Sequence, residues 1–333
     1  MHHEHGLLFF RLDRHKAHGG PADRLADRCR VGGSLRDVDT AHKGPLGNRA
    51  VFCSVVGRYY CVRLLVCRCP MEGFFRTYSD TNLQAPMDAA VVIPTVLRPS
   101  LRQALESIFA QAFSGRIHVL IGIDQMAGDI TMIDQICASR PSHCAVQVFW
   151  PGYSTSVRHG GLTPPGDGGA LRAILSYLAN SPYVAYLDDD NWWAPRHLSD
   201  LRRALDNADW AFSLRWYVHP FSRRPICVDI WESLGPGQGL YKEQFGGFVD
   251  PSSLMINKLA CPSAPQKWNV ALKEDPMGAD RYVFQYLSRH HQACGTGRPT
   301  SFYTLNPYDS LHSLRVQYLG SNYDEAGKIW GAL

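Results

Sequence analysis

Short apolar runs that alternate with helix-like segments constrain the fold of this chain most strongly. Five such runs follow residue 87: Asp88–Pro94, His118–Asp124, Ala145–Trp150, Tyr183–Leu187 and Trp210–Trp216. Runs of this length and composition are typical of strands that are buried on both faces. Because helix-like segments separate them, the sequence predicts an α/β fold with a mixed, mostly parallel sheet that helices cover on both faces.

The segments between these strands have the spacing of amphipathic helices. Apolar residues recur at helical intervals in three sets: Leu101, Leu105, Ile108, Phe109 and Ala112; Leu171, Ile174, Leu175 and Leu178; and Leu198, Leu201 and Leu205. Pro99 and Pro195 precede the first and third sets, where the first helical turn accepts a proline. In such sheets ligands collect at the carboxyl ends of the strands, where Thr95, Asp124 and Asp188 are expected.

The first 86 residues differ in character from the rest. They show no sustained period apart from a β-like run at Val51–Cys67, and they hold 13 Lys and Arg against 8 Asp and Glu. Two interpretations are open: a poorly ordered extension, or non-native sequence from a start site assigned too far upstream, with Met87 opening the protein. We expect the second, and we place the functional domain at residues 87–333.

Charge and hydropathy exclude several classes of protein. Residues 87–333 hold 21 of the 34 basic and 22 of the 30 acidic residues, whereas a nucleic-acid-binding domain concentrates basic charge. No run approaches the roughly 18 apolar residues of a membrane-spanning helix. The apolar stretch Gly6–Phe10 is also too short for a signal peptide. We therefore expect a cytoplasmic protein with reduced cysteines, no nucleic-acid partner and no integral membrane span.

Three consecutive carboxylates, Asp188–Asp190, follow the fourth strand. Like charges on neighbouring residues repel by roughly 3 kcal/mol per pair at 5 Å and an effective dielectric near 20, so a cation is expected there. In an extended segment Asp188 and Asp190 would point the same way and share one ion, while Asp189 would face elsewhere. Oxygen ligands suit Mg²⁺ or Mn²⁺. A negatively charged start to the following helix would explain one carboxylate but not three.

The chain resembles the family 2 glycosyltransferases, which have the GT-A fold. Their opening pattern is similar to "VVIPTVLRPSLRQALESIFAQ" (Val91–Gln111), and their DxD motif is similar to "YLDDDNWWAPRHL" (Tyr186–Leu198). Family members commonly place an arginine 16 residues before the first motif aspartate, and Arg172 stands 16 residues before Asp188. The resemblance covers about residues 88–290, with three motifs in order and register. It implies a Rossmann-like GT-A domain.

The resemblance implies a set of residues that bind a nucleoside-diphosphate sugar linked to UDP or GDP. Thr95 would contact the nucleoside, and Asp124 would accept a hydrogen bond from the base. Arg172 would approach the base or the diphosphate, although the asparagine that often follows this arginine is replaced by alanine. Arg98 and Asp189 belong to the same binding set.

The resemblance also implies a divalent metal, Mn²⁺ or Mg²⁺. Asp188 would address the ribose or the metal, and Asp190 would hold the metal against the diphosphate. His312 is a further candidate ligand, although a single histidine is more often structural. Trp192 and Trp193 would form a platform for a sugar ring, with ordinary core packing as the alternative.

The catalytic base of the family is an Asp or Glu in an acidic motif that opens a helix well after the DxD motif. The stretch "EDPMGADRYVFQYLSRH" fits this description, and Asp280 is our choice for the base, with Asp275 and Glu274 as alternates. The alternative for Asp280 is a helix cap.

The resemblance thus predicts a metal-dependent, inverting hexosyltransferase. It would move a sugar from the nucleotide donor to a hydroxyl of a glycan, a lipid-linked or a protein acceptor. Residues 87–216 would bind the donor, and residues 217–333 the acceptor. A sugar-phosphate nucleotidyltransferase is an alternative, but it needs a glycine-rich phosphate loop after the first strand, and "PTVLRPS" contains no glycine. A non-catalytic carbohydrate-binding protein of the same fold is another.

Overall fold

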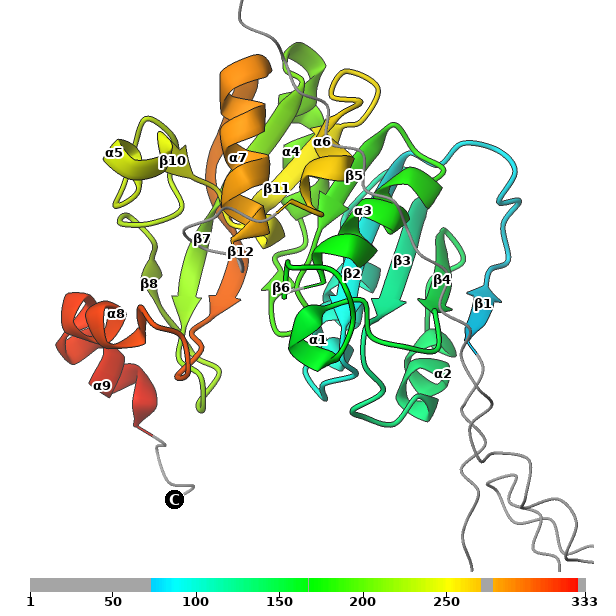
Figure 1. The fold of residues 1–333 in the computed structure, drawn as a ribbon, viewed down its shortest axis with the longest axis horizontal. Helices are drawn as coiled ribbons and strands as arrows, with labels where there is room; N and C mark the ends of the chain where they lie inside the picture. Colours follow the sequence, from blue (N-terminus) through cyan, green and yellow to red (C-terminus); the bar gives the residue numbers. More distant parts are fainter. Residues whose placement is uncertain (1–72, 167, 271–277, 329–333) are drawn as a thin grey trace, which may run out of the picture. The chain divides into compact units, whose positions relative to one another are not determined.

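The computed structural model describes residues 73–166, 168–270 and 278–328. Ten strands form the main sheet (Figure 1), in the order β1-β4-β3-β2-β5-β11-β7-β12-β6, with β8 paired to β7. Their bounds are β1 Phe74–Tyr78, β2 Ala89–Thr95, β3 Ile117–Ile123, β4 Cys144–Trp150, β5 Tyr183–Tyr186, β6 Trp192–Trp193, β7 Trp210–Val218, β8 Pro225–Val228, β11 Leu254–Asn257 and β12 Ala293–Thr304.

Parallel pairings join β4, β3, β2 and β5, and also β7 and β12. The other neighbours in the main sheet are antiparallel. A separate two-stranded sheet joins β9 (Gly235–Pro236) and β10 (Gly247–Phe248). The prediction of an α/β fold with a mixed sheet flanked by helices is confirmed.

Helices cover both faces of the sheet because alternate residues of its strands point to opposite sides. In β2, Val91 and Ile93 belong to one hydrophobic core, and Ala90 and Val92 belong to another. The first core contains residues of α1, α2 and α4, and the second contains residues of α3, α6 and α7. The helices are α1 Leu101–Phe109, α2 Thr131–Cys137, α3 Gly169–Leu178, α4 His197–Ala204, α5 Lys242–Phe245, α6 Ala264–Lys267, α7 Ala279–His290, α8 His312–Leu319 and α9 Ser321–Gly327.

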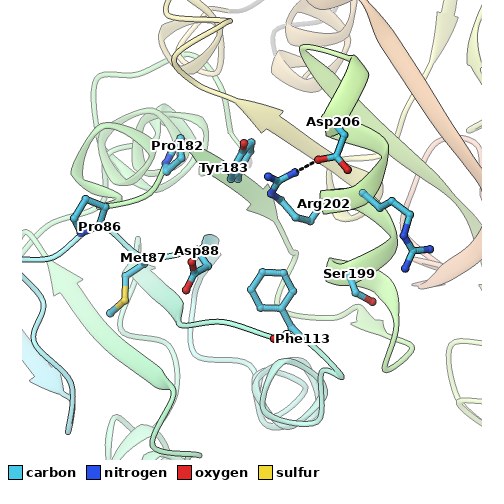
Figure 2. Close-up of a pocket in the computed structure, with 11 residues that line it drawn as sticks. Pro86, Met87, Asp88, Phe113, Pro182, Tyr183, Ser199, Arg202 and Asp206 are labelled. Carbon is cyan, nitrogen blue, oxygen red and sulfur yellow. Dashed lines mark hydrogen bonds and ion pairs between the residues drawn. The ribbon is translucent and has the colours of Figure 1, made fainter.

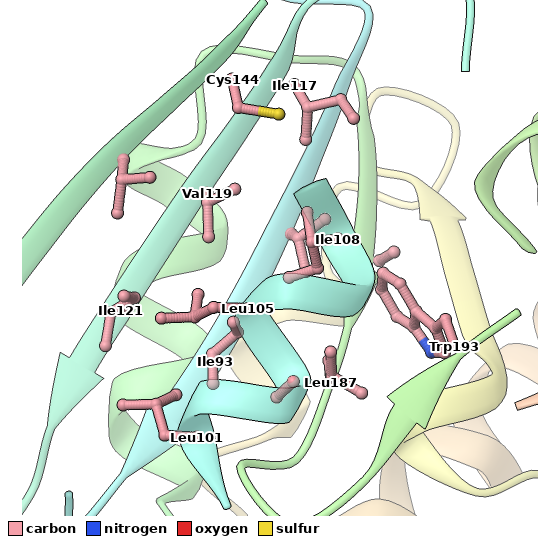
Figure 3. Packing of buried hydrophobic residues seen from close by; sticks show 14 of the residues in the cluster. Ile93, Leu101, Leu105, Ile108, Ile117, Val119, Ile121, Cys144, Leu187 and Trp193 are labelled. Atoms are coloured by element: carbon pink, nitrogen blue, oxygen red, sulfur yellow. The ribbon is translucent and has the colours of Figure 1, made fainter. Parts of the chain in front are cut away.

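The predicted apolar stripe of α1 faces the sheet. Figure 3 shows Leu101, Leu105 and Ile108 against Ile93 and Ile121, and all five side chains are fully buried. Burying an aliphatic side chain of this size contributes roughly 1.5–3 kcal/mol, so this stripe is a main attachment of α1 to the sheet.

Strand β1 corrects one boundary of the sequence analysis. Residues 73–86 were assigned to the N-terminal extension, but Phe74–Tyr78 pairs with β4 along its whole length. Tyr78 also donates a hydrogen bond of 2.5 Å to Asp134 of α2. The strand escaped prediction because it is an edge strand with three exposed central residues and no buried alternation. The rest of the predicted extension, residues 1–72, lies outside the described residues.

Among the described residues, no helix is both long enough and apolar enough to cross a membrane.

Candidate active site

A pocket of about 330 Å³ lies where the parallel strands β2, β3 and β5 end. Thr95 is the last residue of β2, Asp124 follows β3, and Asp188 lies two residues beyond β5. The first turns of α3 and α7 contribute Arg172 and Asp280. This is the edge at which open α/β sheets bind their ligands.

Residues that the sequence analysis singled out come together in this one pocket. They are Thr95, Arg98, Asp124, Arg172, Asp188, Asp189, Asp190 and Asp280. Glu274 and Asp275, the alternates for the base, lie outside the described residues. His312 opens α8, is not among the residues that line the pocket, and stacks edge-on to Tyr323 with ring centroids 5.9 Å apart.

The acidic motif is not extended, which corrects the predicted alternation of its side chains. β5 ends at Tyr186, and a turn begins at Asp189. All three aspartates therefore line the pocket, and Asp189 does not face elsewhere. Its carboxylate accepts hydrogen bonds of 2.7 Å from the Thr95 hydroxyl and 2.7 Å from the Arg98 guanidinium. The turn places the Asp189 carboxylate at the end of β2, within hydrogen-bonding distance of both donors.

Two arginines supply much of the positive charge that three adjacent carboxylates require. Arg172 forms an ion pair with Asp188. Arg98 pairs closely with Asp189, and the same Nη1 atom lies 3.5 Å from an oxygen of Asp190. Arginine side chains of the protein itself thus neutralise part of the negative charge of the three aspartates.

Asp190 keeps an excess of negative charge around it. Burial, followed by the charges of Asp189 and Asp188, raises its pKa to about 7. Its side chain is 37% exposed, and Arg98 opposes the shift only from 3.5 Å. Asp189 also has a raised pKa, chiefly from burial, although Arg98 and Thr95 favour its ionised form. A further cation near Asp190 would lower its pKa and relieve this repulsion.

The carboxylates fit a divalent ion only if a ligand completes its shell. Asp188 and Asp190 line the same pocket, and oxygen ligands suit Mg²⁺ or Mn²⁺. The described residues contain no cluster of three or more His, Cys, Asp and Glu side chains that could hold a metal by themselves. Mg²⁺ commonly binds through one or two carboxylates together with substrate phosphates, and the two aspartates match that mode.

Asp124 ties a long loop to the sheet. Its carboxylate accepts hydrogen bonds of 2.6 Å from the Ser154 hydroxyl and of 2.9 and 2.7 Å from the backbone and hydroxyl of Thr155. The loop brings the exposed Arg158 and His159 to the pocket. Asp124 is only 5% exposed, and a ligand that bonds to its carboxylate would share the oxygens with these loop donors.

Gly168 lets α3 begin beside the end of β2. Its φ of +78° lies in the left-handed region, and a Cβ there would come within 2.6 Å of the Pro94 side chain. This close approach sets Arg172, four residues later, beside Asp188.

Asp280 stands in the first turn of α7 and is partly exposed in the pocket. Its Oδ1 accepts a 2.8 Å hydrogen bond from the backbone amide of Arg281, the next residue, and Gly278 rather than Asp280 stands at the N-cap position. The position is therefore compatible with both a structural and a chemical role for this carboxylate.

The two tryptophans of the motif pack away from the pocket. Trp193 is 3% exposed, stacks on His197 at 4.3 Å, and donates a 2.7 Å hydrogen bond to the carbonyl of Ser252. Trp192 stacks on Phe302 of β12 at 5.2 Å. Neither lines the pocket, so the packing alternative describes their contacts.

Sequence reasoning missed the far side of the pocket, to which Asp250, Tyr303, Thr304, Asn306 and Asp309 contribute. Asp250 is 4% exposed, and burial, opposed by Arg215, raises its pKa to about 6. It caps the short helix Pro251–Ser253, and "DPSS" is a recognisable capping signal. Nothing in that local signal shows that the aspartate also faces a pocket.

A larger, more open pocket of about 630 Å³ lies at the opposite ends of β2 and β5 (Figure 2). Asp88 and Tyr183 mark the amino ends of these strands, and Arg202 pairs with Asp206 at 2.7 Å beside them. None of the predicted site residues lines it. We place the candidate active site in the smaller pocket because the chemistry-bearing side chains converge there.

No protein-family model and no curated protein matches the chain. Solved structures with a similar backbone include S. aureus TarS. It has 13% identity and a TM-score of 0.49, and the match covers 69% of this chain and 39% of that chain. TarS 1–349 in complex with UDP has 13% identity, a TM-score of 0.46, and coverage of 70% and 64%. The mannosyltransferase PcManGT from Pyrobaculum calidifontis, in complex with GDP-Man and Mn²⁺, has 12% identity, a TM-score of 0.45, and coverage of 74% and 66%. The chain spans about two fifths of the length of the first of these, and likeness at this level identifies neither a substrate nor a reaction.

Proposed function

We propose that this protein is a glycosyltransferase that moves a sugar from a UDP- or GDP-linked donor to an acceptor hydroxyl. The observation that carries the proposal is the convergence of motif residues from separate segments, Thr95 to Asp280, on one pocket at the strand ends. The proposed acceptor is a glycan, a lipid-linked or a protein hydroxyl, and the proposed location is the cytoplasm. Residues 87–216 form the proposed donor half, and residues 217–333 the acceptor half.

On the donor side, this chain's residues would bind and orient the nucleotide. Asp124 would accept a hydrogen bond from the base, and Arg98 and Arg172 would meet the diphosphate, where charge develops as the sugar leaves. Gly168, at the start of α3, presents the amino end of that helix to the same pocket, which favours anions. A divalent ion held by Asp188 and Asp190 would, when bound, neutralise the charge of the leaving diphosphate.

On the acceptor side, Asp280 would take the proton of the attacking hydroxyl. As the hydroxyl oxygen bonds to the anomeric carbon, the bond from that carbon to the diphosphate oxygen breaks, and the proton moves to the Asp280 carboxylate. A mechanism with a single general base and no enzyme nucleophile corresponds to inversion at the anomeric carbon. This stereochemistry follows from the family resemblance.

Calorimetry of nucleotide binding tests the proposal. UDP or GDP is expected to bind in the presence of Mn²⁺ and to lose at least about tenfold in affinity after chelation, because Asp188 and Asp190 would then repel the diphosphate. Release of nucleoside diphosphate from a matching donor sugar should follow. Binding of neither nucleotide, with or without Mn²⁺, would refute the glycosyltransferase assignment.

Asp190→Asn is expected to stabilise the metal-free protein at pH 8. The folded pKa of Asp190, about 7, lies above its ordinary value of 3.8, so this carboxylate costs stability progressively as pH rises from 3.8 through 7. Since the side chain is partly exposed, we expect a gain of only about 1 kcal/mol, or about 2–4 °C in the thermal midpoint. The gain should vanish at pH 4. An equal gain at both pH values would exclude titration of Asp190 as its cause.

A further inference from the structure

A buried arginine of β7 holds one carboxylate of the pocket. Arg215 is 1% exposed and donates hydrogen bonds to Asp229, Glu232 and Asp250, at 2.8, 3.2 and 2.6 Å. Only Asp250 of these three lines the pocket. Because an unpaired buried charge is very unfavourable, the Arg215 contact fixes the place of that carboxylate.

A second buried arginine, from α8, holds another carboxylate of the same pocket. Arg315 donates to both oxygens of Glu232, from Nε at 2.7 Å and Nη2 at 2.9 Å. Its remaining Nη1 donates to Asp309 at 2.7 Å. Asp309 lines the pocket and also accepts a 2.9 Å hydrogen bond from the Leu311 backbone. Two parallel bonds between a guanidinium and a carboxylate give both strength and a fixed orientation.

Glu232 joins the two arginines. It is 1% exposed, lies outside the pocket lining, and also accepts a 2.8 Å hydrogen bond from the Tyr217 hydroxyl. A continuous chain of ion pairs therefore runs from Asp250 through Arg215, Glu232 and Arg315 to Asp309.

The same two guanidinium groups hold an aromatic ring of the pocket. The central carbon of Arg215 lies 3.9 Å from the centre of the Tyr303 ring, and that of Arg315 lies 5.4 Å from it. Tyr303 lines the pocket together with Asp250 and Asp309. We call Asp250, Tyr303 and Asp309 the acidic wall, after its two carboxylates.

We propose that Glu232 is a positioning residue that acts through Arg215 and Arg315 to set the geometry of the acidic wall. The wall belongs to the proposed acceptor half, so Glu232 would control acceptor binding without touching the acceptor. This consequence for catalysis rests on the proposed function, whereas the positioning itself does not.

The test replaces Glu232 by Gln, which keeps the shape but turns an NH₂ group toward the arginine donors. With a methyl glycoside as the acceptor, KM for the acceptor is expected to rise by about 10- to 100-fold, since small misplacements of positioning groups cost that much. KM for the nucleotide sugar should stay within about twofold. A role in folding alone would lower the active fraction and leave both KM values unchanged.

Hydrogen exchange supplies a readout that does not depend on turnover. In Glu232→Gln, the backbone amides of residues 303–311 should exchange faster than in the unchanged protein, because Arg315, the partner of Asp309, loses the carboxylate that fixes its orientation. Asp206→Asn is the matched control, since Asp206 also accepts from an arginine, at 2.7 Å, but lies on the exposed surface of α4 and the short helix after it. It should alter neither measurement.

The outcomes separate the two proposals. Faster exchange in residues 303–311 with no turnover of any UDP- or GDP-sugar would keep the positioning role and remove the glycosyltransferase. Unchanged exchange and unchanged acceptor KM in a folded Glu232→Gln protein would overturn the positioning role. If this variant does not fold, Glu232→Asp, which keeps the charge but shortens the side chain that Arg215 and Arg315 share, takes its place under the same criteria.

Discussion

Replacement of Asp280 by asparagine is expected to lower the rate of sugar transfer by about 10²- to 10⁴-fold, the usual contribution of a positioned general base. Asparagine keeps the size and the helix-start hydrogen bond that Asp280 accepts from the Arg281 backbone. It cannot take up a proton. Nucleotide affinity should therefore stay within about twofold, since the donor-side residues are untouched.

Asp324→Asn is the control for this experiment. Asp324 also lies in the first turn of a helix, α9, but it is exposed and does not line the pocket. Steady-state kinetics and calorimetry on both variants check the prediction. If Asp280→Asn transfers sugar at the original rate, this residue has no part in the chemistry.

Replacement of Arg215 by methionine is expected to destabilise the fold by about 3–5 kcal/mol, because breaking a buried ion pair leaves uncompensated charge. Here three carboxylates, Asp229, Glu232 and Asp250, would lose the cation that they share, and each is at most 5% exposed. At this chain length the thermal midpoint should fall by roughly 6–20 °C. Urea unfolding gives the free energy directly.

The loss should depend on pH in a defined direction. Arg215 favours the ionised form of Asp229, Glu232 and Asp250, so its removal raises the pKa of each of these carboxyl groups relative to the unchanged protein. A carboxyl group with a raised folded pKa destabilises the fold more as pH increases. The stability deficit of Arg215→Met should therefore become smaller as pH falls from 8 to 5. Arg202→Met, which breaks the exposed pair with Asp206, should change stability by less than about 1 kcal/mol at either pH. A loss of that small size for Arg215→Met would show that the network adds little to stability.

The sequence predicted best where local pattern and tertiary environment agree. The strands β2, β3, β4, β5 and β7 are mostly apolar runs, and the structure has each within two residues of its predicted start and end. β12 was missed because "ACGTGRPTSFYT" contains glycines and a proline that interrupt the strand pattern, and its pairing with β7 shifts register at Pro299. That strand forms through its partner rather than through its own composition.

Residues of the candidate site also differ in how far the sequence could predict their positions. Thr95, Arg172 and Asp188 belong to motifs with fixed spacing, so their positions could be predicted from a single chain. Asp250 is held by an arginine 35 residues away in the sequence. Asp309 is held by Arg315, six residues away, whose other partner, Glu232, is 83 residues from it. The prediction for the orientation of Asp189 was wrong for a local reason. Side chains alternate with a period of two only within a strand, and β5 ends at Tyr186, before the motif begins.

The hydrogen bonds that Asp124 accepts from Ser154 and Thr155 make this carboxylate the anchor of the loop that carries Arg158 and His159. A carboxylate offers about four acceptor positions, and the loop occupies three of them on the two oxygens of Asp124, so the proposed nucleobase would share an oxygen with a donor of the loop. Occupation of the base position would then weaken the hold of Asp124 on the loop. Nucleotides with different bases should accordingly differ in how freely residues 154–163 move once they are bound.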